Sequence, residues 1–517
     1  MDTSRLLRTT GTVIAAAGLL LSGCTSSGLG EPRASASPAE PGPVPAALRA
    51  YYEQKLSWRD CGVPGFQCTT MKAPLDYADP GTPDSARAID LAVSRRVATG
   101  PGKRLGSLVV NPGGPGGSGI GYLQGYAGIG YPAAVRARYD MVSFDPRGVD
   151  RSTPVECLTG PAMDKFTQVD QTPDDKGEQA LLVAAFKEFA AGCEAHSPRI
   201  LPHVSTVDAA RDMDMLRAVL GDQKLTYVGA SYGTFLGATY ANLFPGRVGR
   251  LVLDGAMDPS RSALEMNRDQ TAGFETAFRS FAKDCAKHPD CPLGQGAPDA
   301  VAERLKEFFR KVDGRPLPTG DAKRPLGEAL ATTGVIAALY DESAWPQLRE
   351  ALAAALAGDG SGLLTLADSY YEREPDGRYA NLMFANAAVN CLDQPPAFDG
   401  PTAVEAALPS FEKASPVFGA GLAWASLNCA YWPVKATGTA GRLTAKGAAP
   451  IVVVGTTRDP ATPYKWAQGL AEQLDSGTLL TYDGDGHTAY GRGSDCVDTA
   501  INRYLLDGTP PPPAKRC

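Results

Sequence analysis

Short apolar runs bounded by Gly, Pro or Asp recur along the chain and predict buried β-strands. Residues 89–93 alternate apolar and polar side chains, which is typical of an early strand. Further β-branched runs stand at residues 108–110, 141–144, 225–228, 251–253, 451–454 and 479–482. Such runs indicate a mainly parallel sheet that is covered on both faces. Helical patterns lie between several of them, one being residues 205–221 with a Ser205-x-x-Asp208 capping box, so the chain is predicted to have an α/β fold.

The strand pattern fades from about residue 259 to residue 440, where apolar residues adopt helical spacing. Two stripes show this spacing and are interpreted as core packing: Phe274, Phe278 and Phe281, and then Leu305, Phe308, Phe309 and Val312. We therefore predict a helical insertion at residues 259–440 that forms a lid over a site. The α/β core is predicted to consist of residues 49–258 and 441–517, because the strand pattern resumes at residue 451.

The N-terminus has the features of an export signal. Two arginines precede an uncharged, mostly apolar run at residues 9–21, which is short for a transmembrane helix. The run ends in Leu-Ser-Gly-Cys24, which resembles the bacterial lipobox. We predict a signal peptide at residues 1–23, a lipid on Cys24 and a flexible tether, rich in Ser, Ala, Gly and Pro, at residues 24–48. The alternative is an ordinary secretory signal with an incidental cysteine.

Eleven cysteines are present, and ten remain when Cys24 is set aside. An even number is what a disulfide framework in an oxidising compartment requires. The chain has no Cys-x-x-Cys pair, which argues against zinc sites and thioredoxin-like redox chemistry, so no metal is expected. The sequence leaves the connectivity open, although short loops and order along the chain suggest Cys61–Cys68, Cys157–Cys193, Cys285–Cys291, Cys391–Cys429 and Cys496–Cys517.

Length and composition limit the class of protein. The chain has 517 residues, more than one ordinary domain, and 43% of them are hydrophobic while 21% are charged. These values exclude a disordered chain, a fibrous chain and a membrane protein with many spans. The 50 Lys and Arg against 57 Asp and Glu give a net charge of −7, which argues against nucleic-acid binding, because a nucleic-acid binder shows a basic field.

A candidate nucleophile lies in Gly-Ala-Ser231-Tyr-Gly, between the predicted strand at 225–228 and a helical run at 232–244. A nucleophile elbow requires this context: the turn is so tight that small residues must flank the serine, whose hydroxyl then projects above the sheet. The alternative interpretation is a structural glycine-rich turn.

The candidate base is His487, which follows the late strand at 479–482 in Asp-Gly-Asp-Gly-His. Serine is a poor nucleophile until a base removes its proton, and a turn at this place can direct a side chain to the carboxyl edge of the sheet. The other three histidines lie before or within the insertion and are interpreted as ordinary surface or core residues: His196, His203 and His288.

The candidate acid is Asp459, which follows the strand at 451–454 and would hold the imidazole in one tautomer. The chain order Ser231, Asp459, His487 matches the order of nucleophile, acid and base in α/β-hydrolases. Asp483 and Asp485 are rival acids, but their adjacency to His487 makes the required side-chain geometry awkward.

An oxyanion hole requires two N–H donors. We predict the backbone N–H of Tyr232, directly after the nucleophile, and that of Gly114, in the glycine-rich stretch that follows the strand at 108–110. The same stretch contains Gly114-x-Gly-x-x-Gly119, a dinucleotide fingerprint on paper. No suitably placed ribose acid stands out and an exported enzyme has little access to such cofactors, so no cofactor is predicted.

At this point the residues resemble a family. Gly-Gly-Pro-Gly at 113–116 and Phe-Asp-Pro-Arg-Gly at 144–148, followed by Arg151-Ser152, are similar to motifs of prolyl iminopeptidases and their relatives. Other segments resemble the bacterial secreted tripeptidyl aminopeptidases: Trp58 with Cys61, and residues 66–68, 74–77, 206–212, 251–255 and 390–393. The stretch with Asp459, His487, Cys496 and Cys517 resembles the TAP-like C-terminal region of that family. The resemblance covers about residues 50–517 and implies an α/β-hydrolase fold with a serine exopeptidase activity that removes tripeptides from free N-termini.

An exopeptidase of this kind requires a group that holds the substrate α-ammonium, and a carboxylate between lid and sheet would do so. Asp393 is the first candidate, because a bridge at Cys391 would fix its backbone, and Glu342 and Glu372 are rivals. For each acid the alternative is a solvated surface group.

The expected partners are peptides with a free N-terminus, without nucleic acid, and the expected contact with a membrane is a lipid at Cys24 only. The expected location is outside the cell, anchored to the outer face of the membrane or secreted. Three other functions stay open: an esterase or lipase with the same triad, an aminopeptidase of another cut length, and a non-catalytic binding lipoprotein.

Overall fold

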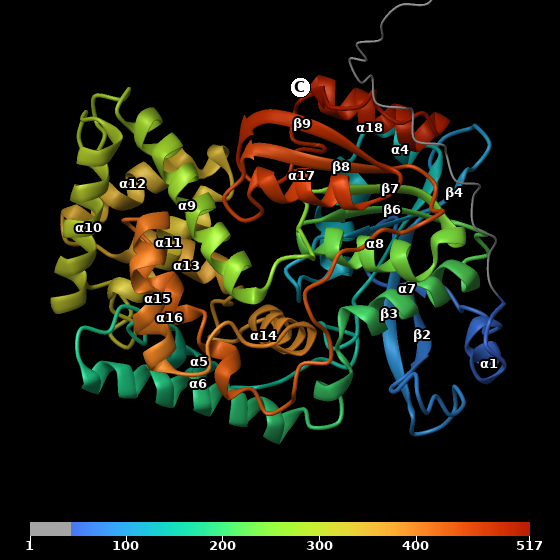
Figure 1. Ribbon diagram of the computed structural model, residues 1–517, viewed down its shortest axis with the longest axis horizontal. Coiled ribbons are helices and arrows are strands. Elements are labelled where there is room, and N and C mark those ends of the chain that lie inside the picture. Colours follow the sequence, from blue (N-terminus) through green and yellow to red (C-terminus); the bar gives the residue numbers. More distant parts are fainter. Residues whose placement is uncertain (1–42) are drawn as a thin grey trace, which may run out of the picture. The chain divides into compact units, whose positions relative to one another are not determined.

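The computed structural model describes residues 43–517, and a ten-stranded sheet organises them (Figure 1). The strand order is β1-β2-β3-β5-β4-β6-β7-β8-β9-β10. The strands are β1 (Arg59–Asp60), β2 (Gln67–Pro74), β3 (Ala88–Arg96), β4 (Gly106–Asn111), β5 (Tyr139–Phe144), β6 (Leu225–Ala230), β7 (Val248–Asp254), β8 (Ile451–Arg458), β9 (Gly477–Asp485) and β10 (Lys515–Arg516). The predicted signal peptide 1–23, Cys24 and the tether up to residue 42 lie outside the described residues.

The sheet is parallel from β5 through β10 in spatial order, and antiparallel where β1, β2 and β3 join it. The carboxyl ends of β4, β6, β7, β8 and β9 therefore meet at one edge, which is where ligands bind in open α/β sheets. The seven strands expected from apolar runs are confirmed. β1, β2 and β10 were not predicted. β1 and β10 are two residues long, and the buried positions of β2 include the polar Thr69 and the small Ala73, so its alternation is weak.

The central strands are apolar throughout because both faces of the sheet are covered. On one face, Ile451 and Val453 of β8 belong to a core with residues of α7 (Thr206–Val219), α8 (Tyr232–Leu243) and α17 (Tyr464–Gln473). On the other face, Val452 and Val454 pack in a core with α4 (Ala133–Arg136) and α18 (Asp495–Asp507). Figure 1 shows these helices on the two sides of the strands. The arrangement confirms the α/β-hydrolase fold class.

The start of α7 differs in one detail from the sequence pattern. The Ser205 hydroxyl accepts the Asp208 N–H at 3.1 Å, as an N-cap should. The Asp208 carboxylate does not bond back to the Ser205 N–H but accepts from the Ser205 hydroxyl and from Arg211. Only half of the predicted capping box therefore forms, whereas a complete one begins the next long helix, between Ser262 and Glu265.

The other side of the molecule is helical and has a core of its own. It contains α9 (Ala263–Cys285), α10 (Pro298–Gly314), α11 (Glu328–Leu339), α12 (Trp345–Leu356) and α13 (Ser361–Tyr370). Both predicted stripes are buried there, so their interpretation as core packing is confirmed. α14 (Leu382–Asp393) lies between these helices and the sheet in Figure 1, and α15 (Pro401–Ala414) and α16 (Gly419–Ala425) follow it.

Two helices that precede the insertion in the sequence also join the helical side. α5 (Gly160–Thr167) and α6 (Lys176–His196) connect β5 to α7. Leu182 and Phe186 of α6 share a core with Phe411 of α15 and Trp424 of α16. Phe189, one turn further along α6, packs against Phe384 of α14 in the core of the sheet, with the ring centroids 5.8 Å apart. α6 thus braces the insertion against the α/β part, a contact that the sequence pattern did not indicate.

A fully buried ion pair holds α7 against the strands. The Arg147 guanidinium donates to both oxygens of Asp212 at 2.7 Å and to the carbonyls of Pro74, Leu75 and His203. The Tyr77 hydroxyl donates to the same carboxylate at 2.7 Å. Every donor of the guanidinium is used, which is the condition under which a buried pair is tolerated, and loss of one partner would leave a buried charge.

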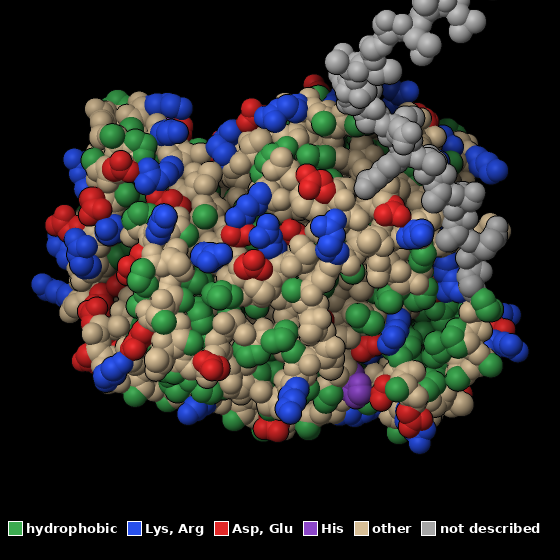
Figure 2. Space-filling model, viewed as in Figure 1, with side chains coloured by type: hydrophobic (Ala, Val, Ile, Leu, Met, Phe, Trp, Pro, Cys, Tyr) green, Lys and Arg blue, Asp and Glu red, His purple; other side chains and the backbone are tan. Residues whose placement is uncertain are grey.

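Five disulfides are formed, and they are the five pairs that chain order and loop length suggested: Cys61–Cys68, Cys157–Cys193, Cys285–Cys291, Cys391–Cys429 and Cys496–Cys517. Such a framework fits an exported protein in an oxidising compartment. Within residues 43–517, none of the helices combines the length and the apolar character needed to cross a membrane. Basic and acidic side chains are interspersed on the face that Figure 2 shows.

A cluster of three acids should make the free energy of unfolding depend on pH. Oxygens of Asp170, Asp313 and Glu328 lie within 4.8 Å of one another, and burial, reinforced by the other two acids, raises the pKa of Glu328 to about 7. The folded state therefore holds a proton that the unfolded chain releases near pH ~4.3, so stability falls as pH rises from ~4.3 to about 7. Glu328→Gln, which removes this charge, should raise the free energy of unfolding at pH 8 by about 1 kcal/mol and change it little at pH 4.

Thermal or denaturant unfolding of the variant at both pH values measures the effect. Glu350→Gln is the matched control, because Glu350 is an exposed glutamate on α12. An equal stabilisation by Glu328→Gln at pH 4 and pH 8 would contradict the expectation.

Candidate active site

Ser231 lies in the sharp turn between β6 and α8 and has a φ of +56° and a ψ of −125°. A positive φ is unusual for a residue with a side chain and persists only where the surroundings enforce it. One such restraint is the Ser231 N–H, which donates to the carbonyl of Asp254 at 2.8 Å. The strand–serine–helix context is the one that the sequence pattern predicts.

The glycines that flank Ser231 are required by space. A Cβ on Gly229 would lie 2.3 Å from the carbonyl oxygen of Gly233, and a Cβ on Gly233 would lie 2.8 Å from Oδ1 of Asn111. Both distances are shorter than any real carbon contact. The Gly-x-Ser-x-Gly spacing therefore follows from how closely β4, β6 and α8 approach one another.

His487 and Asp459 form a close pair at the carboxyl edge of the sheet. Nδ1 of His487 lies 2.9 Å from both carboxylate oxygens of Asp459, which is 2% exposed. The same carboxylate accepts the N–H groups of Ala461 at 2.9 Å, Thr462 at 2.8 Å and Thr488 at 3.2 Å. These donors hold the carboxylate in place, and the carboxylate holds the Nδ1–H tautomer, which leaves Nε2 to accept a proton.

The rival acids and histidines lie elsewhere. Asp483 and Asp485 each form an ion pair with Arg458 at 2.9 Å. His196 bonds to the Cys157 carbonyl through Nδ1, and neither it, His203 nor His288 is among the residues that line the cavity at Ser231. His487 is the one of the four histidines that lies next to the serine turn: a Cβ on Gly255 would be 3.2 Å from its Cε1, and the preceding residue, Asp254, accepts the Ser231 N–H.

Sequence reasoning missed three residues that position His487. The carbonyl of Tyr340, at the end of α11 in the insertion, accepts the His487 N–H at 2.8 Å, and its ring meets the imidazole edge to face with centroids 5.6 Å apart. Thr462 Oγ1 lies 3.4 Å from Nδ1. Tyr340 carries no motif and reaches the site only through the folding of the insertion, so no local signal could have identified it.

Asp254 is the third of these residues. Its buried carboxylate accepts the N–H groups of Ala489 at 3.0 Å and Tyr490 at 2.8 Å, just after His487 in the chain. Burial raises the pKa of Asp254, although the two N–H donors oppose this shift. The sequence pattern predicts a strand at residues 251–253, and residues 251–255 carry a family resemblance, but neither indicates that Asp254 holds the backbone after His487.

The glycine-rich loop after β4 packs directly on the serine turn. A Cβ on Gly113 would lie 2.8 Å from the Tyr232 nitrogen and 2.9 Å from Cβ of Ser231. The Gly113 N–H donates to Asn111, whereas the N–H groups of Gly114 and Tyr232 have no acceptor among residues 43–517. Gly114 has a φ of +110° and lines the cavity beside Ser231, so the two predicted donors are unpaired next to the nucleophile.

Ser231 opens into a cavity of about 330 Å³ between the sheet edge and the insertion. Its wall is partly apolar, with Phe235, Met257 and Met266, and partly polar, with side chains from α9, α14 and the segment that follows α14. The volume is at the lower end of the range of ligand pockets.

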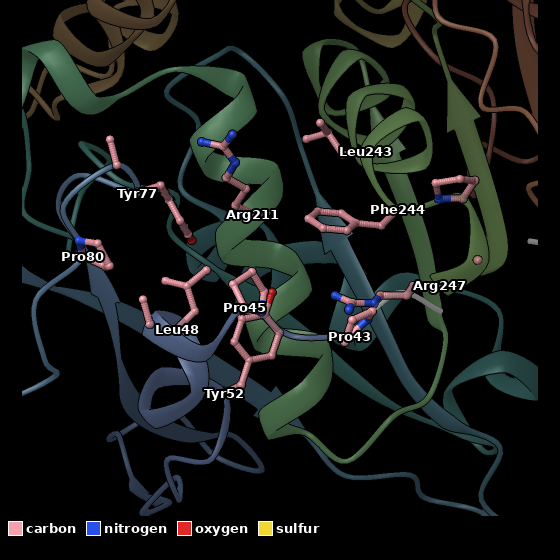
Figure 3. A pocket seen from close by; sticks show the side chains of 14 residues that line it. Pro43, Pro45, Leu48, Tyr52, Tyr77, Pro80, Arg211, Leu243, Phe244 and Arg247 are labelled. Atoms are coloured by element: carbon pink, nitrogen blue, oxygen red, sulfur yellow. The ribbon is translucent and has the colours of Figure 1, made fainter. Parts of the chain in front are cut away.

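A second, larger pocket of about 640 Å³ shares no lining residue with this cavity. Figure 3 shows it between α1 (Arg49–Tyr52) and α7, with Tyr52, Tyr77 and Phe244 among its walls. Its cations are engaged, since Arg211 pairs with Asp208 and Arg247 with Asp214, and it contains no residue of the predicted site.

Of the three acids proposed for the substrate N-terminus, only Asp393 lines the cavity at Ser231. Its carboxylate accepts the Thr206 N–H at 2.8 Å and the Thr206 hydroxyl, and burial raises its pKa to about 7. Glu342 and Glu372 are exposed residues of the insertion and lie outside that lining.

Comparisons with known proteins show which family the chain is similar to. Residues 415–517 match the model of the family described as TAP-like protein. The chain is 39% identical over 482 residues to serine protease Hip1 of Mycobacterium tuberculosis, covering 90% of this chain and 91% of the relative. It is 37% identical over 517 residues to carboxylesterase B of the same organism, covering 97% and 96%. It is 33% identical over 476 residues to the tripeptidyl aminopeptidase of Streptomyces lividans, covering 88% and 84%.

Among solved structures, the proline iminopeptidase of Mycobacterium smegmatis aligns with a TM-score of 0.33 at 14% identity, covering 85% of this chain and 98% of that one.

Removal of the Asp254 carboxylate should misplace His487. Asp254→Ala leaves two buried N–H groups without an acceptor, so we expect the free energy of unfolding to fall by about 1–3 kcal/mol. We also expect kcat on p-nitrophenyl acetate to fall by about tenfold or more, because a displaced base no longer reaches the nucleophile. Asp254→Asn keeps one carbonyl acceptor and should lose less of both. Wild-type stability and kcat in Asp254→Ala would show that this carboxylate has no positioning role.

Proposed function

This chain belongs to the tripeptidyl aminopeptidase family of α/β-hydrolase serine hydrolases, and we propose that it releases tripeptides from the free N-termini of peptides. The proposal assigns Ser231 as nucleophile, His487 as general base and acid, and Asp459 as the residue that orients His487. The observation that carries it is the pair of His487 Nδ1 and the buried Asp459 carboxylate at 2.9 Å, with Ala461 and Thr462, whose N–H groups bind this carboxylate, in the wall of the cavity that Ser231 lines.

The chemistry follows from these positions. Nε2 of His487 takes the Ser231 proton while Oγ attacks the carbonyl carbon of the third residue of the peptide. The N–H groups of Gly114 and Tyr232 bind the oxyanion of the tetrahedral intermediate. His487 then gives its proton to the nitrogen of the leaving peptide, and the tripeptide remains as an ester on Ser231. Water, deprotonated by His487, attacks this ester and releases the tripeptide and the serine hydroxyl.

Asp393 is the proposed partner of the substrate α-ammonium. It lies in the same cavity as Ser231, and no Lys, Arg or His within residues 43–517 pairs with it. A carboxylate without a cation in a partly desolvated cavity is suited to a charged hydrogen bond with an ammonium. This unpaired acid supports a peptidase over an esterase, which is the main alternative given the carboxylesterase name among the relatives.

We propose in addition that the enzyme acts outside the cell as a lipoprotein anchored through Cys24. The five disulfides support export, and the motif at Cys24 supports the anchor, although that residue lies outside the described part of the chain.

Ser231→Ala should abolish turnover and leave the fold intact. Because members of a triad act as a unit, Ser231→Ala and His487→Ala should each lower kcat by about 10⁴-fold or more, and by similar factors. The measurements are hydrolysis of a tripeptide amide and labelling by a serine-reactive phosphonate, with thermal unfolding as the check on folding. Labelling that persists in Ser231→Ala, or a peptidase rate half that of the wild type, would refute the assignment.

The role of Asp393 is tested with a tripeptide amide reporter in free and N-acetylated forms. We expect acetylation to lower kcat/KM about 100-fold or more, because a buried carboxylate is then left without its partner. Asp393→Asn should lower kcat/KM for the free form and change that for the acetylated form little. Since the Asp393 carboxyl has a pKa of about 7 and a peptide α-ammonium one of about 7.7–8.0, the ratio of free to acetylated kcat/KM should rise from pH 6 to a maximum between these two values in the wild type, and this rise should be absent in Asp393→Asn.

The ratio cancels every pH effect that is common to the two substrates. Glu342→Gln and Glu372→Gln are matched controls from the insertion and should behave as the wild type does. Equal rates on free and acetylated substrates in the wild-type enzyme would exclude an exopeptidase and favour an esterase or endopeptidase.

A further inference from the structure

α14 presents a polar stripe to the cavity at Ser231. Asn386, Asn390 and Asp393 are spaced four and three residues apart, so they lie on one face of the helix, and all three line the cavity. The opposite face is apolar and packs in the core of the sheet through Phe384, Ala388 and Leu392. A row of amides and a carboxylate on the cavity side of an otherwise buried helix points to a ligand with main-chain-like hydrogen bonding.

One end of the stripe is attached to the oxyanion loop. The Asn386 amide donates to the carbonyl of Pro115 at 3.1 Å. A Cβ on Gly116 would lie 2.5 Å from the Leu382 carbonyl and 3.0 Å from the Asn386 nitrogen, so loop and helix are in direct contact. Asn386 therefore sits next to the loop that carries Gly114.

The other end of the stripe carries the acid and a buried unpaired acceptor. Asp393 ends the helix, and its carboxylate is held by Thr206. Gln394, which follows, is 6% exposed and lines the cavity, and its Oε1 has no hydrogen-bond partner in the described part of the chain. A buried acceptor without a partner is costly, and a bound donor would satisfy it.

Asn390, in the middle of the stripe, has hydrogen-bonding groups that no other described residue uses. The Asn390 Nδ2 donates to Oδ1 of Asn386 at 3.0 Å, while its own Oδ1 has no donor among residues 43–517. Its amide thus offers one acceptor and one remaining N–H to the cavity. The main chain of an extended peptide offers the complementary C=O and N–H groups.

The length of the stripe matches a defined number of residues. From Asn386 to Asp393, seven residues further along the α-helix, the rise is about 10.5 Å. Three residues of extended peptide span about 10 Å. A peptide whose ammonium lies at Asp393 therefore brings its third carbonyl to the loop with Gly114.

We propose that the polar stripe of α14, with Gln394, sets the length of the peptide that the enzyme releases, an inference that rests on the proposed peptidase function. We call this set of residues the length gauge. Asp393 and the Oε1 of Gln394 receive the α-ammonium, Asn390 binds the peptide main chain between the ends, and Asn386 positions Asn390 and the oxyanion loop. The substrate class that this gauge selects is an extended peptide with a free N-terminus, cut after its third residue. Cys391–Cys429 fixes the gauge to the adjacent wall, where Cys429 lines the same cavity.

The test measures kcat/KM on alanine amides of one to four residues with the same fluorogenic leaving group, together with the products from a longer peptide by mass spectrometry. The wild type should prefer three alanines and release tripeptides. Asn390→Leu, close in size without hydrogen bonds, should lower kcat/KM on three alanines by about 10- to 100-fold, reduce the preference over two and four, and release mixed lengths. Asn390→Gln keeps the amide and should retain more of the preference.

Gln394→Leu should raise KM for the free tripeptide amide severalfold more than for its acetylated form, because only the free amine donates to Oε1. Gln295→Leu, at an exposed glutamine of the insertion, is the matched control and should leave the length profile unchanged. Thermal unfolding of each variant confirms that it is folded.

Two failures are distinguishable. A wild-type enzyme without a preference for three residues would overturn both the gauge and the proposed tripeptidyl activity. A wild-type preference for three residues that Asn390→Leu retains, with tripeptides as its products, would overturn the gauge alone.

Discussion

The candidate site depends on one buried aspartate at the carboxyl end of a central strand. The carbonyl of Asp254 restrains the serine turn through the Ser231 N–H, and its carboxylate restrains the backbone after His487. β7 lies between β6, which leads to Ser231, and β8, which leads to Asp459. β9, which leads to His487, pairs with β8. Because β6 through β9 are parallel and in fixed register, their carboxyl ends place Ser231, Asp459 and His487, the proposed nucleophile, acid and base, at one edge. The arrangement of these three residues is therefore a consequence of strand pairing.

The sheet and the insertion contribute differently. The sheet edge holds Ser231, Asp459 and His487, while the insertion provides most of the cavity wall and, through Tyr340, touches His487 itself. A displacement of the insertion would thus change the base as well as the space for substrate. This contact couples the shape of the cavity to the position of the reacting groups.

Residues far from the cavity support it through α7. Arg147 pairs with Asp212 in the middle of this helix, and Thr206 at its start holds both Asp393 and the hydroxyl of Tyr232. The buried ion pair thereby fixes the helix end on which the acid of α14 rests. The family motifs at Pro74 to Tyr77 and around Arg147, which contribute no residue to the cavity, have their physical role here.

The sequence alone determined what local pattern controls. Apolar runs marked the central strands, because a strand covered on both faces must be apolar throughout. Gly-Ala-Ser231-Tyr-Gly marked the turn, because only glycine fits at its first and last positions. Short loops and chain order left the connectivity of the ten cysteines open but suggested the five pairs that are formed. This pattern did not predict strand β2, because its buried positions include the polar Thr69.

Tertiary structure alone decided which distant side chains meet. The sequence favoured Asp393 over Glu342 and Glu372 only through the neighbouring Cys391, and only the packing of α14 against the glycine-rich loop places Asp393 in the cavity. The same holds for Tyr340 beside His487 and for the unpaired oxygen of Gln394, neither of which has a local signature. Local propensity depends on a few neighbouring residues, whereas a cavity is made by segments hundreds of residues apart, and the fold brings them together only as a whole.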